Sequence, residues 1–150
     1  NKVFGEWAAA GRFLPGLTDI RPEFTWEDSR FDFLLEDAQG KIFVEVKGVT
    51  LEEDGEVRFP DAPTERGVKH LRGLQRAAAQ GHRAAAFFVV QMKGPVRFRP
   101  NDATHPAFGA ALREAAGNGV GVYAYDCLVT PDSLTLDAPV PMDLSTWGAR

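Results

Sequence analysis

Hydrophobic and polar residues along this chain form short periodic segments, and the pattern predicts an ordered series of strands and helices. Segments 30–36 and 41–49 combine aromatic and β-branched residues with period-two alternation, which is typical of half-buried strands. Segments 84–92 and 119–129 are almost continuously apolar, as expected of strands buried on both faces. Shorter strands are expected at 22–26 and 56–59.

Apolar residues three or four positions apart predict helices at 2–11, 63–80 and 106–116. Pro63 is a favourable first helical residue and should open the second of these helices. The Pro- and Asp-rich tail from Thr130 predicts a small strand and a surface wrap that packs on the rest. The order helix, antiparallel strands, helix, strand, helix, strand predicts an α/β (α+β) fold with a mixed β-sheet flanked by helices.

Composition favours a single globular domain that spans residues 1–150. The chain has 150 residues, of which 44% are hydrophobic and 25% are charged. No apolar run approaches the roughly 18 residues of a membrane helix, and the N-terminus lacks a signal-peptide pattern, so we expect a soluble, cytoplasmic protein. The single cysteine, Cys127, excludes an internal disulfide and is expected in the core, as are Trp7, Trp26 and Trp147.

Three polar residues interrupt the two clearest strands. Side chains alternate along a strand, so Asp32 shares a face with Arg30 and Leu34, whereas Phe31, Phe33 and Leu35 take the other face. Glu45 and Lys47 share a face of segment 41–49. A symmetric turn at 37–40 would pair residues whose numbers add up to 77, which places Asp32 opposite Glu45 with Lys47 one diagonal away. Opposed carboxylates destabilise a sheet unless a cation lies between them.

Two interpretations of this cluster remain open on the pattern alone. In the first, Lys47 neutralises Asp32 and Glu45 on an ion-paired surface. In the second, the carboxylates bind Mg²⁺ or Mn²⁺ for phosphodiester hydrolysis, with Lys47 as catalytic partner. The three histidines and one cysteine show no zinc-ligand spacing, which favours a hard, oxygen-bound metal. Glu6, on the first helix, is the candidate for a third carboxylate.

Charge is distributed unevenly along the chain. The formal net charge is −4, but segment 56–99 carries nine Arg or Lys and three acids, a net +6. On a helical wheel for 63–80, the basic side chains separate from the apolar ones. Candidate phosphate-backbone contacts are Arg30, beside Asp32, and Arg66, Lys69, His70 and Arg76 on the predicted helix.

Longer strings of the sequence resemble a known family. The strings are SRFDFLL (29–35), VEVKGVTL (44–51), FPDAPTERGVKHL (59–71), GHRAAAFFVVQ (81–91) and GVYAYDC (121–127). In this order they resemble the sugar fermentation stimulation protein A family, whose nuclease-like domain is similar to the PD-(D/E)xK superfamily. The resemblance implies a restriction-endonuclease-like fold, with Asp32, Glu45 and Lys47 at the nuclease-motif positions and Glu6 where such folds often place a helix carboxylate.

Members of that family usually carry an N-terminal OB-like domain before the nuclease-like domain, and this chain starts about where that domain would end. The resemblance therefore implies a DNA-binding, nuclease-like domain that lacks the OB-like module and binds DNA more weakly than the parent protein, without sequence specificity. A non-catalytic DNA-binding regulator linked to sugar metabolism is the first alternative. A protein-interaction module that binds no nucleic acid is the second and is consistent with the net charge of −4. The sequence does not decide whether the protein is an enzyme, nor its oligomeric state.

Overall fold

Residues 1–146, which the computed structural model describes, form three helices and nine strands. The helices are α1 (Lys2–Ala9), α2 (Glu65–Ala79) and α3 (Pro106–Gly117). The strands are β1 (Asp19–Trp26), β2 (Ser29–Asp37), β3 (Gly40–Val49), β4 (Leu51–Glu53), β5 (Glu56–Phe59), β6 (Arg83–Val90), β7 (Arg97–Pro100), β8 (Gly121–Val129) and β9 (Leu134–Pro139).

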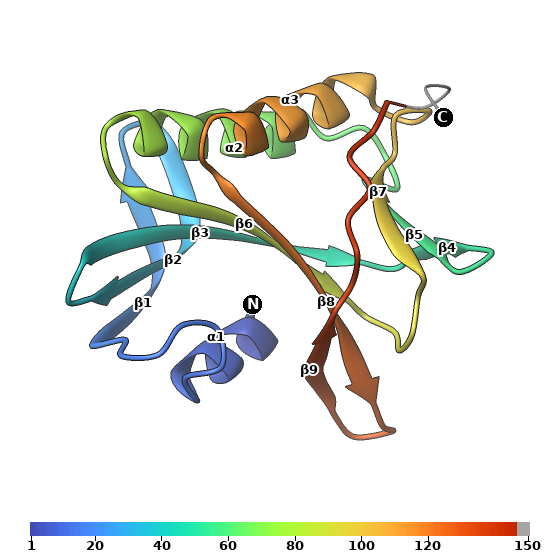
Figure 1. Ribbon diagram of the computed structural model, residues 1–150, viewed down its shortest axis with the longest axis horizontal. Coiled ribbons are helices and arrows are strands. Elements are labelled where there is room, and N and C mark those ends of the chain that lie inside the picture. The colour runs from blue at the N-terminus through green and yellow to red at the C-terminus, as the bar shows by residue number, and fades with distance from the viewer. Residues whose placement is uncertain (147–150) are drawn as a thin grey trace.

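The main sheet is mixed, as the sequence predicts, and has the strand order β1-β2-β3-β6-β8-β9 (Figure 1). The strands β1, β2 and β3 form an antiparallel meander, whereas β6 runs parallel to both β3 and β8. The tail strand β9 pairs antiparallel with β8 at the edge of the sheet. The connections β3–α2–β6 and β6–α3–β8 thus place two helices between parallel strands.

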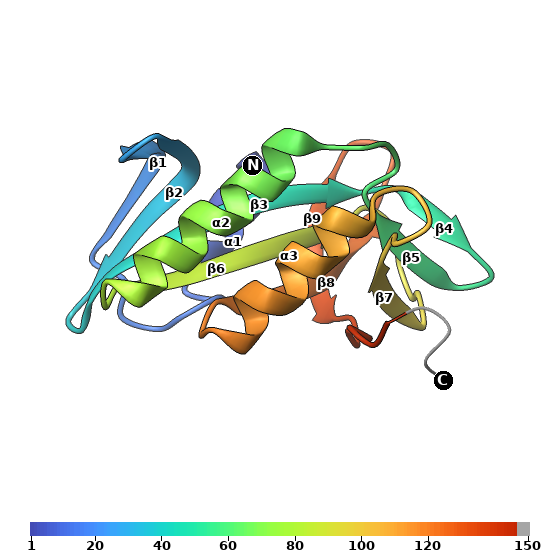
Figure 2. The ribbon, with the colours of Figure 1, turned by 90° about the horizontal axis from the view of Figure 1, so that it is seen from above.

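The helices cover the sheet unequally. Helices α2 and α3 lie side by side on one face, and the short α1 lies on the other (Figures 1 and 2). Each face has its own hydrophobic core: Leu74, Phe88 and Leu112 belong to the first, and Phe4 and Phe87 to the second. Strand β6 contributes to both cores, because its residues from Ala84 onward are buried on both sides. Helices therefore cover both faces of the sheet.

A second, three-stranded sheet was not predicted. The strand expected at 56–59 forms as β5, but it does not extend the main sheet, which its sequence alone would have allowed. It pairs instead with β4 and with β7 in the order β4-β5-β7. The cause is the tight turn at Asp54–Gly55, where both residues have positive φ, 54° and 84°. Asp-Gly is a strong hairpin signal, and it folds β5 back onto the residues just before it.

Helix α2 begins two residues later than predicted. Thr64 is its N-cap, and the hydroxyl oxygen accepts a hydrogen bond from the backbone N–H of Gly67 at 2.9 Å, so Pro63 precedes the helix. The imidazole Nδ1 of His105 accepts a hydrogen bond from the N–H of Thr64 at 3.0 Å. These two contacts fix where α2 starts and therefore which of its side chains face the sheet.

The predicted packing residues are placed as expected where the structure describes them. Trp7 is buried with the α1 core, Trp26 packs against the other core, and Cys127 is fully buried. Trp147 lies outside the described residues. None of the helices within residues 1–146 has the length and apolarity that crossing a membrane requires.

Candidate functional site

A pocket of about 380 Å³ opens where β2 and β3 separate. Their ladder follows the predicted register, with Leu35 opposite Ile42, and its last pair is Phe33 with Val44. Beyond this pair, backbone N–H groups of the two strands donate to side-chain carboxylates and not to backbone carbonyls. The Asp32 carboxylate accepts from the N–H of Val46 at 2.7 Å, and Oε1 of Glu45 accepts from the N–H of Asp32 at 3.2 Å. The two predicted carboxylates therefore meet at the point where the sheet opens.

The strict alternation predicted for β2 fails at this point. Phe31 lies in the α2 core with Phe43, not on the face of Phe33 and Leu35 as predicted. The β1 residue level with Asp32 is Glu23, which has φ 56° and no ladder partner in the described register. Phe31 and Phe33, the residues on either side of Asp32, thus lie in different cores. Asp32 itself is half-buried and lines the pocket.

Glu45 is the most buried acid of the site, with its side chain only 4% exposed. Its Oε2 lies 2.5 Å from Nδ1 of His70 and 2.9 Å from the Lys47 ammonium, and Nδ1 and Nζ lie 3.2 Å apart. An ionised carboxylate only accepts hydrogen bonds, so Nδ1 is the donor in its contact with Glu45. Burial alone would raise the pKa of Glu45, but the His70 hydrogen bond and the Lys47 charge together lower it.

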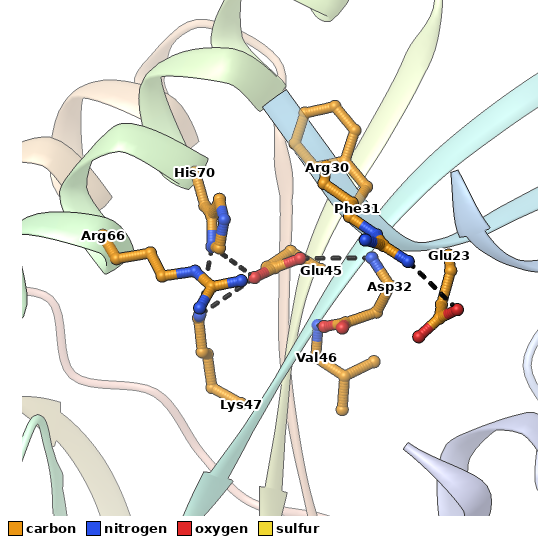
Figure 3. Close-up of a pocket in the computed structure, with 9 residues that line it drawn as sticks. All are labelled: Glu23, Arg30, Phe31, Asp32, Glu45, Val46, Lys47, Arg66 and His70. Atoms are coloured by element: carbon orange, nitrogen blue, oxygen red, sulfur yellow. Dashed lines mark hydrogen bonds and ion pairs between the residues drawn. The ribbon is translucent and has the colours of Figure 1, made fainter. Parts of the chain in front are cut away.

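Asp32 has the opposite electrostatic environment. Burial and the neighbouring charge of Glu45 raise the pKa of Asp32, and the hydrogen bond from Val46 offsets this only in part. Figure 3 shows Lys47, His70 and Arg66 approaching Glu45 from one side, with Asp32 on the other. Lys47 and Arg66 therefore bring positive charge to the side of Glu45, and Asp32 carries the less compensated charge.

The predicted nucleic-acid contacts divide into three groups. Arg30 and Arg66 line the pocket, and Arg30 also pairs with Glu23 at 3.1 Å. Lys69 is exposed on α2 outside the pocket. Arg76 is bound by Glu27 and Asp28 of the β1–β2 turn, at 3.2 and 2.8 Å, so it anchors that turn to α2.

His70 was wrongly assigned to the exposed basic face of α2. It is buried and bound to Glu45, because α2 turns Gly67, His70 and Leu74 toward the sheet. The helical wheel places His70 near the boundary of the two faces, and only the packing of α2 on β2 and β3 decides the side. His70 is thus a part of the acidic cluster.

Glu6 was wrongly expected to complete the carboxylate cluster. It lines a separate pocket between α1 and β9, with Trp7 and Leu136. The apolar side of α1, with Phe4 and Trp7, faces the sheet and turns Glu6 toward β9. The side chain near α1 that does reach the cluster is Asn1, whose Nδ2 donates to Oδ1 of Asp32 at 2.8 Å.

Two site residues escaped the sequence analysis, namely Asn1 and Glu23. Asn1 carries a recognisable signal, because an Asn directly before an amphipathic helix is a favoured N-cap, but that signal predicts capping and not a contact with Asp32. Glu23 carries no signal of its own, since glutamate is not among the residue types that favour its positive φ of 56°.

The donor set fits a hard divalent cation held by few protein ligands. Within residues 1–146, no three His, Cys, Asp or Glu side chains lie close enough to share a metal ion. Asp32 and Glu45 remain as carboxylates on one pocket wall. A buried pair of like charges gains from a cation, and Mg²⁺ commonly uses one or two carboxylates and keeps several waters. The pair therefore suits Mg²⁺ or a similar ion better than zinc.

Comparisons with known proteins agree with one another. The profile of the sugar fermentation stimulation protein RE domain matches residues 1–133. A sugar fermentation stimulation protein homolog from Clostridium beijerinckii is 53% identical over 136 residues, which is 91% of this chain and 60% of that protein. A homolog from Desulfitobacterium hafniense (strain Y51) is 58% identical over 134 residues, 89% of this chain and 58% of that protein.

A solved structure shares the fold. The structure of Pyrococcus furiosus SfsA in complex with Ca²⁺ matches with a TM-score of 0.87 and 28% identity, over 95% of this chain and 63% of that chain. The chain thus spans roughly three fifths of the length of these relatives.

Proposed function

This chain belongs to the sugar fermentation stimulation protein family, and from that premise we propose that its pocket is a divalent-metal site for phosphodiester hydrolysis in DNA. The observation that carries the proposal is the meeting of Asp32, Glu45 and Lys47 in one pocket whose rim bears Arg30 and Arg66. Acids at the base and cations at the rim suit a substrate that brings its own negative charge and accepts metal-assisted attack.

Asp32 and Glu45 are the residues that would hold the cation, and Mg²⁺ or Mn²⁺ is the proposed ion. The Ca²⁺ complex of the Pyrococcus furiosus relative supports a divalent ion in this family. When bound, such an ion supplies Lewis-acid polarisation of the scissile phosphate.

The remaining side chains have roles that follow from their positions. Lys47 bridges Glu45 and the pocket, with its side chain 20% exposed, so its ammonium can hold a phosphate oxygen without leaving the cluster. His70 fixes the Glu45 carboxylate from α2, 2.5 Å away. Arg66 reaches the pocket from α2, and the exposed Lys69 and Arg72 continue along the same helix. Such a row binds a phosphate backbone without reading bases.

A plasmid assay tests the hydrolytic proposal. Supercoiled DNA is incubated with the protein and Mn²⁺ or Mg²⁺, with EDTA as the metal-free control. Lys47→Ala should abolish metal-dependent nicking, whereas Lys41→Ala, an exposed lysine at the other end of β3, should leave it unchanged. Cleavage that does not depend on metal, or that persists in Lys47→Ala, would contradict the proposal.

A non-catalytic DNA-binding regulator is the second candidate, and one observation favours it. Lys47 and His70 already contact Oε2 of Glu45, so the structure neutralises this acid without a metal. If the protein only binds DNA, affinity should fall steeply with salt and no product should form. Arg66→Glu and Lys69→Glu should each flatten the salt dependence by about one unit of slope, whereas Lys41→Glu should not.

A further inference from the structure

Asn1 occupies the N-cap position of α1 but does not cap the helix. Its side chain makes no hydrogen bond to the first turn, although Asn at this position ordinarily accepts one from a backbone N–H. The amide instead spans to β2, where Nδ2 donates to Oδ1 of Asp32 at 2.8 Å. The Asn1 side chain therefore makes no capping hydrogen bond within α1 and bonds to a residue 31 positions away in the sequence.

This contact completes the fixation of the Asp32 carboxylate. Oδ2 accepts from the N–H of Val46 at 2.7 Å, and Oδ1 accepts from Asn1. Two donors from two different elements thus hold the two oxygens, and together they define the plane of the carboxylate. Each oxygen has a second lone pair that remains available to a cation.

The packing of α1 keeps Asn1 in place. Phe4 is fully buried, and its ring centroid lies 5.2 Å from that of Phe33 and 4.8 Å from that of Phe87. Asn1 lies three residues before Phe4 and hence on the same side of the helix. Because Phe33 directly follows Asp32, the contact that anchors α1 also brings Asn1 over the carboxylate.

We propose that Asn1 is a positioning residue for the metal site and that its amide holds Asp32 in the orientation that binds a divalent cation. The inference rests on the proposed function. It assigns to Asn1 the contribution from α1 that the sequence pattern assigned to Glu6. Groups that orient a metal ligand typically change metal affinity about 10–100-fold when removed.

Calorimetric titration of the full chain with Mn²⁺ tests this proposal without any measurement of activity. Asn1→Ala should weaken Mn²⁺ binding about 10–100-fold. Asn1→Ser separates positioning from capping, because serine is a strong N-cap but is too short to reach Asp32 as the amide does. Asn1→Ser should therefore bind Mn²⁺ as weakly as Asn1→Ala while its thermal unfolding without metal stays at or above that of Asn1→Ala. Glu6→Gln, on the same helix, should bind like the unsubstituted protein.

The outcomes separate this inference from the proposed function. Normal Mn²⁺ affinity in Asn1→Ser, alongside lost affinity in Asp32→Asn, would overturn the role of Asn1 and leave the metal site intact. Weakened affinity in Glu6→Gln with normal affinity in Asn1→Ala would restore the sequence-based assignment. No Mn²⁺ binding by the unsubstituted protein would overturn both proposals.

Discussion

Replacing Asp32 by Asn should stabilise the metal-free protein, because burial and the charge of Glu45 both disfavour an ionised carboxylate at this position. Burial and the charge of Glu45 raise the pKa of Asp32. An Asn at this position can still accept from the N–H of Val46, and its NH₂ can donate to a rotated Asn1 amide. The substitution thus removes the repulsion while its hydrogen bonds are kept.

The gain can be bounded from the arrangement of charges. Two unit charges about 4 Å apart repel by about 4 kcal/mol at an effective dielectric constant of about 20. The Lys47 ammonium and the hydrogen bond from His70 already stabilise the Glu45 charge, which leaves a gain of about 1–2 kcal/mol for removing the charge of Asp32. For a domain of this size each kcal/mol shifts Tm by about 2–4 °C, so Tm should rise by about 2–8 °C.

The pKa of Asp32 predicts how the stability difference between the two proteins changes with pH. Because the folded-state pKa of Asp32 lies above the ordinary value of 3.8, its contribution to stability is fully present below pH 3.8 and is lost as pH rises through the folded-state pKa. Thermal unfolding in EDTA should therefore show the variant's advantage at pH 7, and the advantage should narrow as pH falls toward 4. Asp132→Asn, on an exposed turn, should change stability by less than about 0.5 kcal/mol. An Asp32→Asn variant that melts at or below the unsubstituted protein in EDTA at pH 7 would refute this reasoning.

Three further predictions follow from the packing of the site and the core. Lys47→Met should lower metal-free stability by about 1–3 kcal/mol, because the buried Glu45 loses the ammonium that lies 2.9 Å from its Oε2, and denaturant unfolding in EDTA measures this loss. Gly73→Ala should destabilise the protein by about 1–3 kcal/mol, since the added Cβ would lie 2.5 Å from the hydroxyl oxygen of Ser29 in β2. Gly117→Ala is the matched control, because a Cβ there would meet nothing within 4 Å. Equal urea midpoints for the two variants would contradict the close approach of α2 to β2. Burial raises the pKa of the Cys127 thiol to about 11, so it should react with a disulfide reagent at pH 8 only after denaturation; rapid reaction of the native protein would contradict this.

The meeting of the two carboxylates was predictable because local rules decide it. A short turn sets the register of an antiparallel hairpin, and the paired residues Leu35 and Ile42 confirm the register predicted from the sequence. The rule needs no information from distant parts of the chain. It therefore brought Asp32 and Glu45 together correctly, although the ladder itself ends one pair earlier, at Phe33 and Val44.

The assignments that failed each depend on how one element packs on another. His70 lies near the boundary of the two faces of α2, and a small rotation of the helix decides between solvent and Glu45. Glu6 and Asn1 are both polar residues at the N-terminal half of one amphipathic segment, and the burial of Phe4 selects which one faces Asp32. Such rotations depend on the volumes of the side chains that pack in the core, and the periodicity of one helix gives no information about them.

The sequence by itself determined the order of the three helices and of the main-sheet strands, the mixed sheet, the register of β2 on β3 and the family. These properties follow from hydrophobic periodicity, turn residues and extended sequence similarity, all of which can be identified in the sequence without a structure. Only the tertiary structure decided that His70 belongs to the cluster and that Asn1 contacts Asp32. The physical reason is that hydrogen bonds and ion pairs form between side chains within about 3 Å, a distance that is set by the packing of whole helices and sheets.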